Sequence, residues 1–161
     1  MKKTYKRKKG QSISKAKKYS FQGVEYKSGL EMYMAKVLSE NDLEFKYEPT
    51  RFSLQESFHF EGEVYERQAN SKGDYIQRGQ KKILPITYTP DFIGEGFIIE
   101  TKGYANESFP LKWKMFKRLV QDTLEGVVLY KPQNRKECDT TIELILQHRK
   151  RKKITTGWCS S

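Results

Sequence analysis

Apolar residues recur with helical spacing in the segment that follows Ser28. The positions that share one face of this segment are Leu30, Met34, Val37 and Leu38. Ser28 suits the N-cap position, because its hydroxyl can accept a hydrogen bond from a free backbone N–H of the first turn. The pattern therefore predicts a helix that begins after Ser28 and ends near Asn41.

Strand-like alternation of apolar and polar residues covers much of the next part of the chain and one short segment before the helix. The predicted strands are Phe21–Tyr26, 44–54, 56–66 and Ile83–Phe92. Residues 67–82 are rich in Gln, Asn, Lys and Gly, so they predict a loop or a hairpin tip. The turn residues Gly94–Gly96 connect the last strand to the apolar run Phe97–Ile99, and this arrangement predicts a β-hairpin.

Two more helices and one strand are predicted in the last third of the chain. Residues 108–121 form an amphipathic helix with Ser108 as its cap and Pro110 tolerated in its first turn. Its expected inward face consists of Leu111, Met115, Phe116 and Leu119. A buried strand is expected at Gly126–Tyr130 and a final helix at Thr141–Arg151, so the order is helix, several strands, helix, strand, helix.

The net charge of +11 is concentrated at the two ends of the 161-residue chain. Residues 1–18 hold nine Lys and Arg and no acid, and residues 149–153 are five consecutive bases, whereas residues 19–148 hold 17 bases and 20 acids. We therefore expect a flexible basic arm over 1–20, a folded domain over 21–148 and a basic tail over 149–161. Such ends attract a polyanion, for which nucleic acid is the natural candidate; basic tails that only aid solubility are the alternative.

The composition argues against several classes of protein. Cys138 and Cys159 lie far apart, so neither a disulfide framework nor a zinc cluster is supported. His59 and His148 are too few for zinc catalysis through paired imidazoles. Because the chain has no apolar run of membrane length and its basic N-terminus has no apolar stretch of a signal peptide, we expect a cytoplasmic protein without membrane contact.

The residues that indicate chemistry are Pro90-Asp91 and, nine positions after the aspartate, Glu100-Thr101-Lys102. Alternation in a strand places Glu100 and Lys102 on one face, and the predicted hairpin brings Asp91 back beside them. Two carboxylates and a backbone carbonyl such as that of Thr101 are hard ligands that suit Mg²⁺. Lys102 would then orient or deprotonate a water molecule, or stabilise the transition state of phosphodiester cleavage.

A structural interpretation competes with each of these candidates. Glu and Lys two residues apart are commonly a solvated strand face, but here the apolar pair Ile98-Ile99 precedes them, where charges without partners would be costly. Glu31 lies three residues after Ser28, so spacing alone favours a capping box in which its carboxylate bonds the helix N-terminus. A metal ligand in the first turn of that helix is the functional alternative for Glu31.

These residues resemble the PD-(D/E)XK nuclease superfamily. Ser28–Glu31, Tyr88–Phe92 and Glu100–Gly103 are similar to the pattern of the phage endonuclease I family, whose members resolve Holliday junctions. A second, poorly characterised phage and prophage nuclease family is similar over residues 5–130. The resemblance implies a phage- or prophage-encoded protein of the host cytoplasm.

The resemblance also implies a fold, a cofactor and site residues. The implied fold class is α/β (α+β), with a restriction-endonuclease-like core in which a central mixed sheet is flanked by helices, and it assigns 21–148 as the nuclease domain. Mg²⁺ is the implied cofactor, with Mn²⁺ as a substitute, and the implied catalytic residues are Glu31, Asp91, Glu100 and Lys102, with Glu31 now among the metal ligands. Residues 56–83 are longer and more polar than the matching part of endonuclease I, which leaves dimer architecture and junction specificity open.

Three functions follow as alternatives: an endonuclease selective for branched DNA, a nuclease of linear duplex or single-stranded DNA in phage replication or host-DNA breakdown, and a nucleic-acid-binding protein that does not cut. A homodimer would suit paired incisions across a branch. The basic residues expected to contact DNA are Lys6, Arg7, Lys8, Lys9, Lys112, Lys114, Lys117, Arg118, Arg149, Lys150 and Arg151. Tyr47, Tyr88 and Trp113 suit base stacking, although such aromatics are more commonly core residues.

Overall fold

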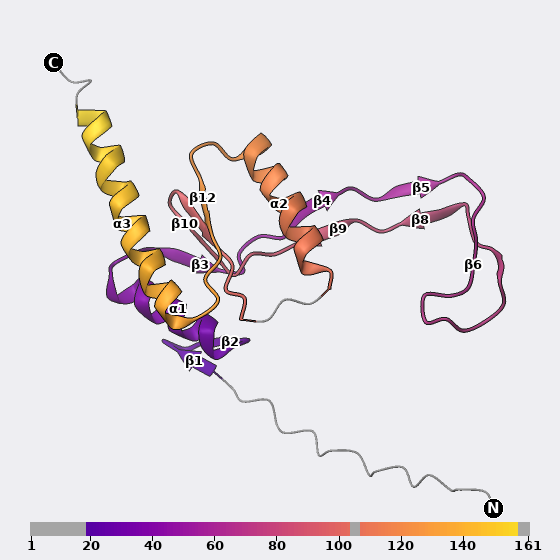
Figure 1. Ribbon diagram of the computed structural model, residues 1–161, viewed down its shortest axis with the longest axis horizontal. Coiled ribbons are helices and arrows are strands. Elements are labelled where there is room, and N and C mark those ends of the chain that lie inside the picture. Colours follow the sequence, from indigo (N-terminus) through magenta and orange to yellow (C-terminus); the bar gives the residue numbers. More distant parts are fainter. Residues whose placement is uncertain (1–18, 104–106, 158–161) are drawn as a thin grey trace, which may run out of the picture.

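The computed structural model describes residues 19–103 and 107–157, which form an α+β fold (Figure 1). The helices in these ranges are α1 (Gly29–Glu40), α2 (Phe109–Thr123) and α3 (Arg135–Gly157). The strands before the extended middle of the chain are β1 (Tyr19–Phe21), β2 (Val24–Tyr26), β3 (Phe45–Tyr47), β4 (Phe52–Gln55), β5 (Phe58–Phe60) and β6 (Tyr65–Glu66). The later strands are β7 (Ile76–Gln77), β8 (Lys81–Ile83), β9 (Ile86–Tyr88), β10 (Phe92–Gly94), β11 (Phe97–Ile99) and β12 (Val128–Tyr130).

A mixed four-stranded sheet with the order β12-β11-β10-β3 forms the centre of the fold. β10 pairs antiparallel with β11 and β3, whereas β11 and β12 are parallel. The predicted hairpin is therefore present, with Phe92 opposite Ile99 and the turn closed by Gly96 at a φ of 75°. The mixed sheet and its helices confirm the expected α+β class.

Helices pack on both faces of this sheet and bury an apolar cluster on each. Phe92, Phe97 and Ile99 belong to the cluster on the side of α1 and α3, two helices that also contact each other. Ile98 points to the other side, where it joins Tyr88 and the inner face of α2. A fully buried side chain of this size contributes about 1.5–3 kcal/mol, so these two clusters hold the sheet between the helices.

The segment from β5 to β8 projects from the body as a long two-stranded arm (Figure 1). β5 pairs with β8, and β6 pairs with β7 nearer the tip. Of the two alternatives predicted for 67–82, the hairpin tip is confirmed, because the turn between the paired strands β6 and β7 lies there, whereas a loop throughout is wrong, since the segment contains β7 and most of β8. Most large apolar side chains that are exposed in the described residues lie on or beside this arm: Phe58, Phe60, Tyr65, Tyr75, Ile76, Ile83 and Leu84.

Proline and left-handed backbone explain most of the breaks in the expected strands. Phe21–Tyr26 is a hairpin of β1 and β2, because Gln22 and Gly23 both have positive φ values, as a tight two-residue turn requires. The expected strand 83–92 is divided among β8, β9 and β10 at Pro85 and Pro90, which lack an N–H for a ladder. The expected strand 44–54 is divided into β3 and β4 at Glu48, which has a positive φ, and Pro49. The expected strand 56–66 is divided into β5 and β6, with no proline or positive φ between them.

The inner face of α2 differs from the expected one. The buried residues are Phe109, Trp113, Phe116 and Val120, while Leu111 is 61% exposed, so its inward placement was wrong. Ser108 lies in the αR region and makes no side-chain capping hydrogen bond, which also corrects the expected cap. Pro110 does occupy the first turn, as predicted.

The last helix, α3, begins six residues earlier than expected and continues to Gly157. Asn134 caps it: its Oδ1 accepts from the N–H of Glu137 at 3.0 Å, and the Glu137 carboxylate accepts from the Gln133 N–H and the Asn134 amide.

None of the helices in the described ranges is long and apolar enough to cross a bilayer. Residues 1–18 of the expected arm, and Cys159, lie outside the described residues, whereas Cys138 is buried with a free thiol.

Candidate active site

Asp91 lies between β9 and β10 and is 8% exposed. Its Oδ2 accepts hydrogen bonds from both the N–H and the hydroxyl of Thr101, each at 2.7 Å. The antiparallel register of β10 and β11 makes this contact possible, because it places the residue before Phe92 beside the residues after Ile99. Two donors from Thr101 thus fix the aspartate next to Glu100.

Glu100 follows β11 and is 4% exposed. Its backbone N–H bonds the Tyr130 carbonyl at 3.0 Å, which continues the parallel pairing with β12 beyond the strand. Its Oε1 lies 3.7 Å from Lys102 Nζ, whereas Oε2 is buried and has no hydrogen-bond partner among the described residues. A buried acceptor in this state is costly, because it gives up hydration without a compensating hydrogen bond.

Lys102 is the half-buried cation of the site. Its ammonium approaches Glu100 on one side and lies 4.9 Å from the centre of the Phe109 ring on the other. Its backbone N–H donates to the Pro132 carbonyl at 3.0 Å, which fixes the backbone from which the side chain extends. Asp91, Glu100 and Lys102 therefore come together at one end of the central sheet.

Burial makes both carboxyl groups hard to ionise. It is the main cause that raises the pKa of Asp91, which the two Thr101 hydrogen bonds partly offset. Burial also raises the pKa of Glu100, with the charge of Asp91 as the next cause, while the Tyr88 hydroxyl and Lys102 act in the opposite direction. Two neighbouring carboxyls with raised pKa values are a known feature of functional sites, and a cation between them would reverse both shifts.

Glu31 lies in the first turn of α1 and is buried, at 7% exposed. Ser28 Oγ accepts from the Glu31 N–H at 3.1 Å, so the predicted helix cap is confirmed. The Glu31 carboxylate, however, does not bond the N–H of the cap residue. Its Oε2 accepts from the N–H of Lys27, the residue before the cap, at 3.0 Å, and from the Tyr47 hydroxyl at 2.5 Å. Its charge raises the pKa values of Asp91 and Glu100, which places it near both groups.

Sequence reasoning missed the residues that connect Glu31 to Asp91. Tyr47 ends β3 and bonds Glu31, and the next residue, Glu48, donates its N–H to the Asp91 carbonyl at 2.8 Å. Glu48 also pairs with the Lys27 ammonium. Glu48 has a positive φ of 43°, a strained backbone conformation that the sequence does not reveal.

A shallow hollow of about 340 Å³ adjoins these residues. It is lined by Lys27, Glu48, Pro49, Arg51 and Thr89. It adjoins Pro90-Asp91 and contains the cations Lys27 and Arg51, of which Lys27 already pairs with Glu48.

Tyr88 is a second residue whose place in the site was not foreseen. It is 7% exposed, and its buried hydroxyl interacts with the Glu100 carboxylate. Burial and, after it, this carboxylate raise the pKa of Tyr88, while the hydroxyl acts to lower the pKa of Glu100. Its ring packs against Phe116 in the α2 cluster at 4.6 Å between centres. Tyr88 and Trp113 are thus core residues, and a base-stacking role is not available to either in this arrangement.

The donor set fits a hard divalent cation. In residues 19–103 and 107–157 no group of three or more His, Cys, Asp or Glu side chains is arranged to hold a metal ion. Mg²⁺ does not need one, because it keeps several waters and takes few protein carboxylates. Asp91 and Glu100 supply two carboxylates, and Glu100 Oε2, which has no hydrogen-bond partner within normal geometry among the described residues, is of the oxygen type that Mg²⁺ prefers.

Comparison with protein-family models, curated proteins and solved structures gives no match for this chain. The resemblance to phage nucleases therefore stays a prediction that rests on the residues themselves.

The basic residues expected to bind DNA differ in their surroundings. Lys112 donates to the Thr87 carbonyl at 3.1 Å, and Arg118 pairs with Asp122 at 2.7 Å, so both already have partners. Lys114 and Lys117 are exposed on α2, and Lys150 and Arg151 are exposed on α3. Lys6, Arg7, Lys8 and Lys9 lie outside the described residues, and Arg149 lines a cavity that is described below.

Proposed function

We propose that this protein is a Mg²⁺-dependent endodeoxyribonuclease that cleaves phosphodiester bonds of DNA. The observation that carries the proposal is the buried pair of Asp91 and Glu100 beside Lys102, with Glu100 Oε2 making no hydrogen bond within the part of the chain that the structure describes. Glu31 supports it as a third carboxylate near the pair. We further propose that the sheet and its helices are a restriction-endonuclease-like core, encoded by a phage or prophage and active in the host cytoplasm.

Each side chain has a distinct role in this proposal. Asp91 and Glu100, with the Thr101 carbonyl, would hold the cation. Glu31 is not grouped with them as a third ligand among the described residues, so it would contribute through its negative charge from α1. The cation would supply positive charge to the phosphate and Lewis acidity to the attacking water. Lys102 orients or deprotonates that water, or stabilises charge on the phosphate, from its position beside Glu100. Thr101 keeps Asp91 in place through two hydrogen bonds.

The preferred substrate in this proposal is branched DNA. A matched pair of a four-way junction and a linear duplex of the same sequence, with single-stranded DNA as a third substrate, tests it in the presence of Mg²⁺. We expect the junction to be cut at least tenfold faster than the duplex. Equal rates would contradict selectivity for branched DNA and favour a nuclease of linear DNA. Binding without cleavage of any substrate would contradict the nuclease and favour a nucleic-acid-binding protein that does not cut.

A homodimer is the proposed assembly, because paired cuts across a branch need two sites. The arm supports it: the outgoing segment 56–66 has four Glu and no Lys or Arg, and the returning segment 76–83 has Arg78, Lys81 and Lys82 and no acid. Two arms related by a twofold axis would place acidic against basic segments and cover the exposed apolar residues. Light scattering should give about twice the 19.0 kDa chain mass, and a change of Phe58 and Ile83 to serine should give the monomer.

Tyr47→Phe tests whether the position of Glu31 matters. The change removes the hydroxyl that donates to Glu31 Oε2 and leaves the ring in its cluster with Tyr26 and Phe92. We expect kcat to fall about tenfold with KM within about twofold, since one hydrogen bond to a charged group contributes about 1.5–3 kcal/mol. Tyr33→Phe is the control, because the Tyr33 hydroxyl bonds Asp139 on the surface at 2.8 Å. An equal loss in both variants would contradict a role for Tyr47 in the site.

A further inference from the structure

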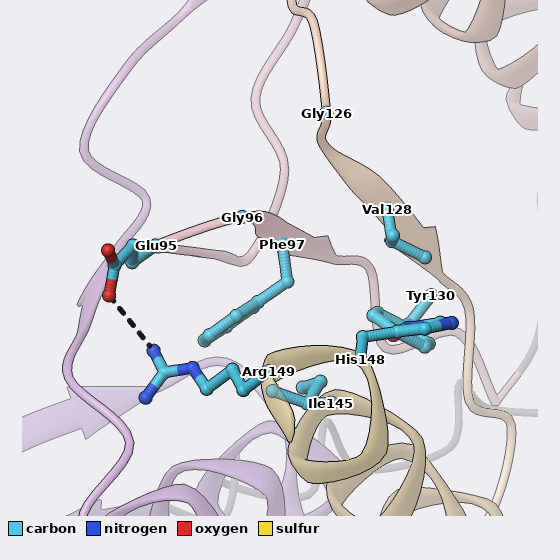
Figure 2. A pocket seen from close by; sticks show the side chains of 9 residues that line it. All are labelled: Glu95, Gly96, Phe97, Gly126, Val128, Tyr130, Ile145, His148 and Arg149. Atoms are coloured by element: carbon cyan, nitrogen blue, oxygen red, sulfur yellow. Dashed lines mark hydrogen bonds and ion pairs between the residues drawn. The ribbon is translucent and has the colours of Figure 1, made fainter. Parts of the chain in front are cut away.

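A partly enclosed cavity of about 310 Å³ lies between α3 and the beginning of β11. Its Glu95–Phe97 end lies at the opposite end of β11 from Glu100, and its other end reaches Tyr130, whose carbonyl accepts from the Glu100 N–H. The side chains that line it are not those of the candidate active site. Figure 2 shows polar groups at its two ends, with Glu95 and Arg149 at one and Tyr130 and His148 at the other. Its size is at the lower end of ligand pockets, about 300–1,000 Å³, so it suits one small molecule or one residue of a polymer.

Arg149 is the anion-binding group of this cavity. Its Nη2 is 3.7 Å from Glu95 Oε2, and the Glu95 side chain is 92% exposed, so this ion pair is loose. Its Nε is buried and has no hydrogen-bond partner among the described residues. Nε and Nη2 form the side of the guanidinium that binds two oxygens of one phosphate, and the long side chain can turn to present both.

The middle and the far end of the cavity suit a ring that carries polar atoms. Apolar side chains of Phe97, Val128 and Ile145 separate the two polar ends (Figure 2). At the far end the Tyr130 hydroxyl and His148 Nδ1 form a hydrogen bond of 2.8 Å, and their rings stand 6.4 Å apart between centres. A base at this end would meet aromatic surface, and a hydrogen bond from it would share or replace the one between these two side chains.

We propose that this cavity binds a nucleoside 5′-monophosphate, with the phosphate at Arg149 and the base toward Tyr130 and His148. The two polar ends and the apolar middle match the phosphate, the base and the sugar between them. A free mononucleotide and the 5′-phosphorylated end of a DNA strand share this chemistry. The proposal is independent of the nuclease activity, because none of its residues belongs to the site around Asp91.

Isothermal titration calorimetry in EDTA tests the proposal without any cleavage. The probes are deoxythymidine 5′-monophosphate, deoxythymidine and inorganic phosphate. We expect the nucleotide to bind at least tenfold more tightly than either part alone. Absence of binding at millimolar nucleotide, or binding of phosphate as tight as that of the nucleotide, would overturn the proposal.

Arg149→Gln and Lys150→Gln form a matched pair, since both remove one positive charge from neighbouring positions of α3. We expect at least tenfold weaker nucleotide binding for the first and a change within twofold for the second. Arg149→Lys keeps the charge but loses the bidentate contact with phosphate, so it should also weaken nucleotide binding at least tenfold. This second variant allows the test even if Arg149→Gln does not fold. Equal effects of Arg149→Gln and Lys150→Gln would overturn the assignment.

Two strands, a 5′-phosphorylated oligothymidylate and the same strand with a 5′-hydroxyl, show whether the ligand of the cavity is a free mononucleotide or the 5′-phosphorylated end of a DNA strand. Tighter binding of the phosphorylated strand, lost in Arg149→Gln, would assign the cavity to strand ends. Equal binding of the two strands, with the mononucleotide still bound, would assign it to the free nucleotide.

Discussion

Lys102→Ala is expected to lower the rate of DNA cleavage at least ~1000-fold while DNA binding stays within about threefold. Lys102 is the cation beside the buried carboxylates: its ammonium lies 3.7 Å from Glu100 Oε1 and 4.9 Å from the centre of the Phe109 ring. In the proposed function the basic ends of the chain would supply most of the attraction to DNA, so we expect one lysine to add little to affinity. Cleavage is followed with Mg²⁺, and binding by fluorescence anisotropy in EDTA.

Asp91→Asn should have a loss of the same order, because an amide at this position keeps the shape of the side chain but not its charge. Lys36→Ala and Glu40→Gln are the matched controls, since Lys36 and Glu40 form a surface pair at 3.6 Å on α1. Both should cleave at rates within twofold of the unchanged protein. Cleavage by Lys102→Ala within tenfold of that rate would exclude a catalytic role for this lysine, and a parallel loss of DNA binding would indicate a structural one.

The hairpin of β10 and β11 could be predicted from the sequence because everything that specifies it is local. Gly94–Gly96 form the turn, and the alternation of side chains in β11 sets the side to which Glu100 points. The contact of Asp91 with Thr101 then follows from register. This short-range origin explains why the centre of the candidate site could be foreseen without coordinates.

The remaining parts of the site depend on contacts between distant segments. Tyr47 meets Glu31 only because β3 is added to the edge of the sheet next to β10 and α1 packs across it, and no spacing in the sequence indicates this pairing. The returning half of the arm has the same origin, since β7 and most of β8 lie in a polar segment predicted as a loop or hairpin tip and become strands by pairing with β6 and β5. Tertiary pairing overrides local preference in both cases.

The beginning of α3 is different, because the sequence did contain a signal for it. Asn134 and Glu137 have the spacing of a capping box, and the structure has the matching hydrogen bonds. The prediction placed the helix start at Thr141 because apolar periodicity begins later than the helix does. The inward face of α2 was wrong for a related reason: Leu111 is apolar, but Phe109 and Trp113 occupy the buried face.

In the absence of divalent metal, the protein should lose stability as the pH rises from 5 to 8. Burial raises the pKa of Asp91 to about 6 and that of Glu100 to about 7, so between pH 4 and those values the folded state binds more protons than the unfolded state. The stabilisation from the two protonated carboxyls is complete below pH 4 and is lost as the pH rises through 6 to 7. The free energy of unfolding should fall by on the order of 3 kcal/mol by pH 8. One pKa unit corresponds to about 1.4 kcal/mol, and because the two groups titrate together their two shifts do not add in full.

Glu100→Gln isolates the contribution of this site from that of other titrating groups. In EDTA at pH 8 the variant should melt about 5 °C higher than the unchanged protein, because it removes a buried charge, whereas at pH 5 the two should melt within about 1 °C of each other. Glu40→Gln is the control and should leave the melting temperature unchanged at both values. A Glu100→Gln variant that is less stable than the unchanged protein at pH 8 would mean that the ionised carboxylate is already satisfied without metal.

Mg²⁺ should reverse the penalty at pH 8, since a cation between the carboxylates stabilises their ionised forms. At a concentration 100 times its dissociation constant it should stabilise the folded protein by about 2.7 kcal/mol, and this gain should disappear in Glu100→Gln and persist in Glu40→Gln. The measurement reads binding alone and needs no substrate. Stabilisation by Mg²⁺ that is equal in both variants would place the cation elsewhere, and the burial of Asp91 and Glu100 would then need a structural explanation in place of a catalytic one.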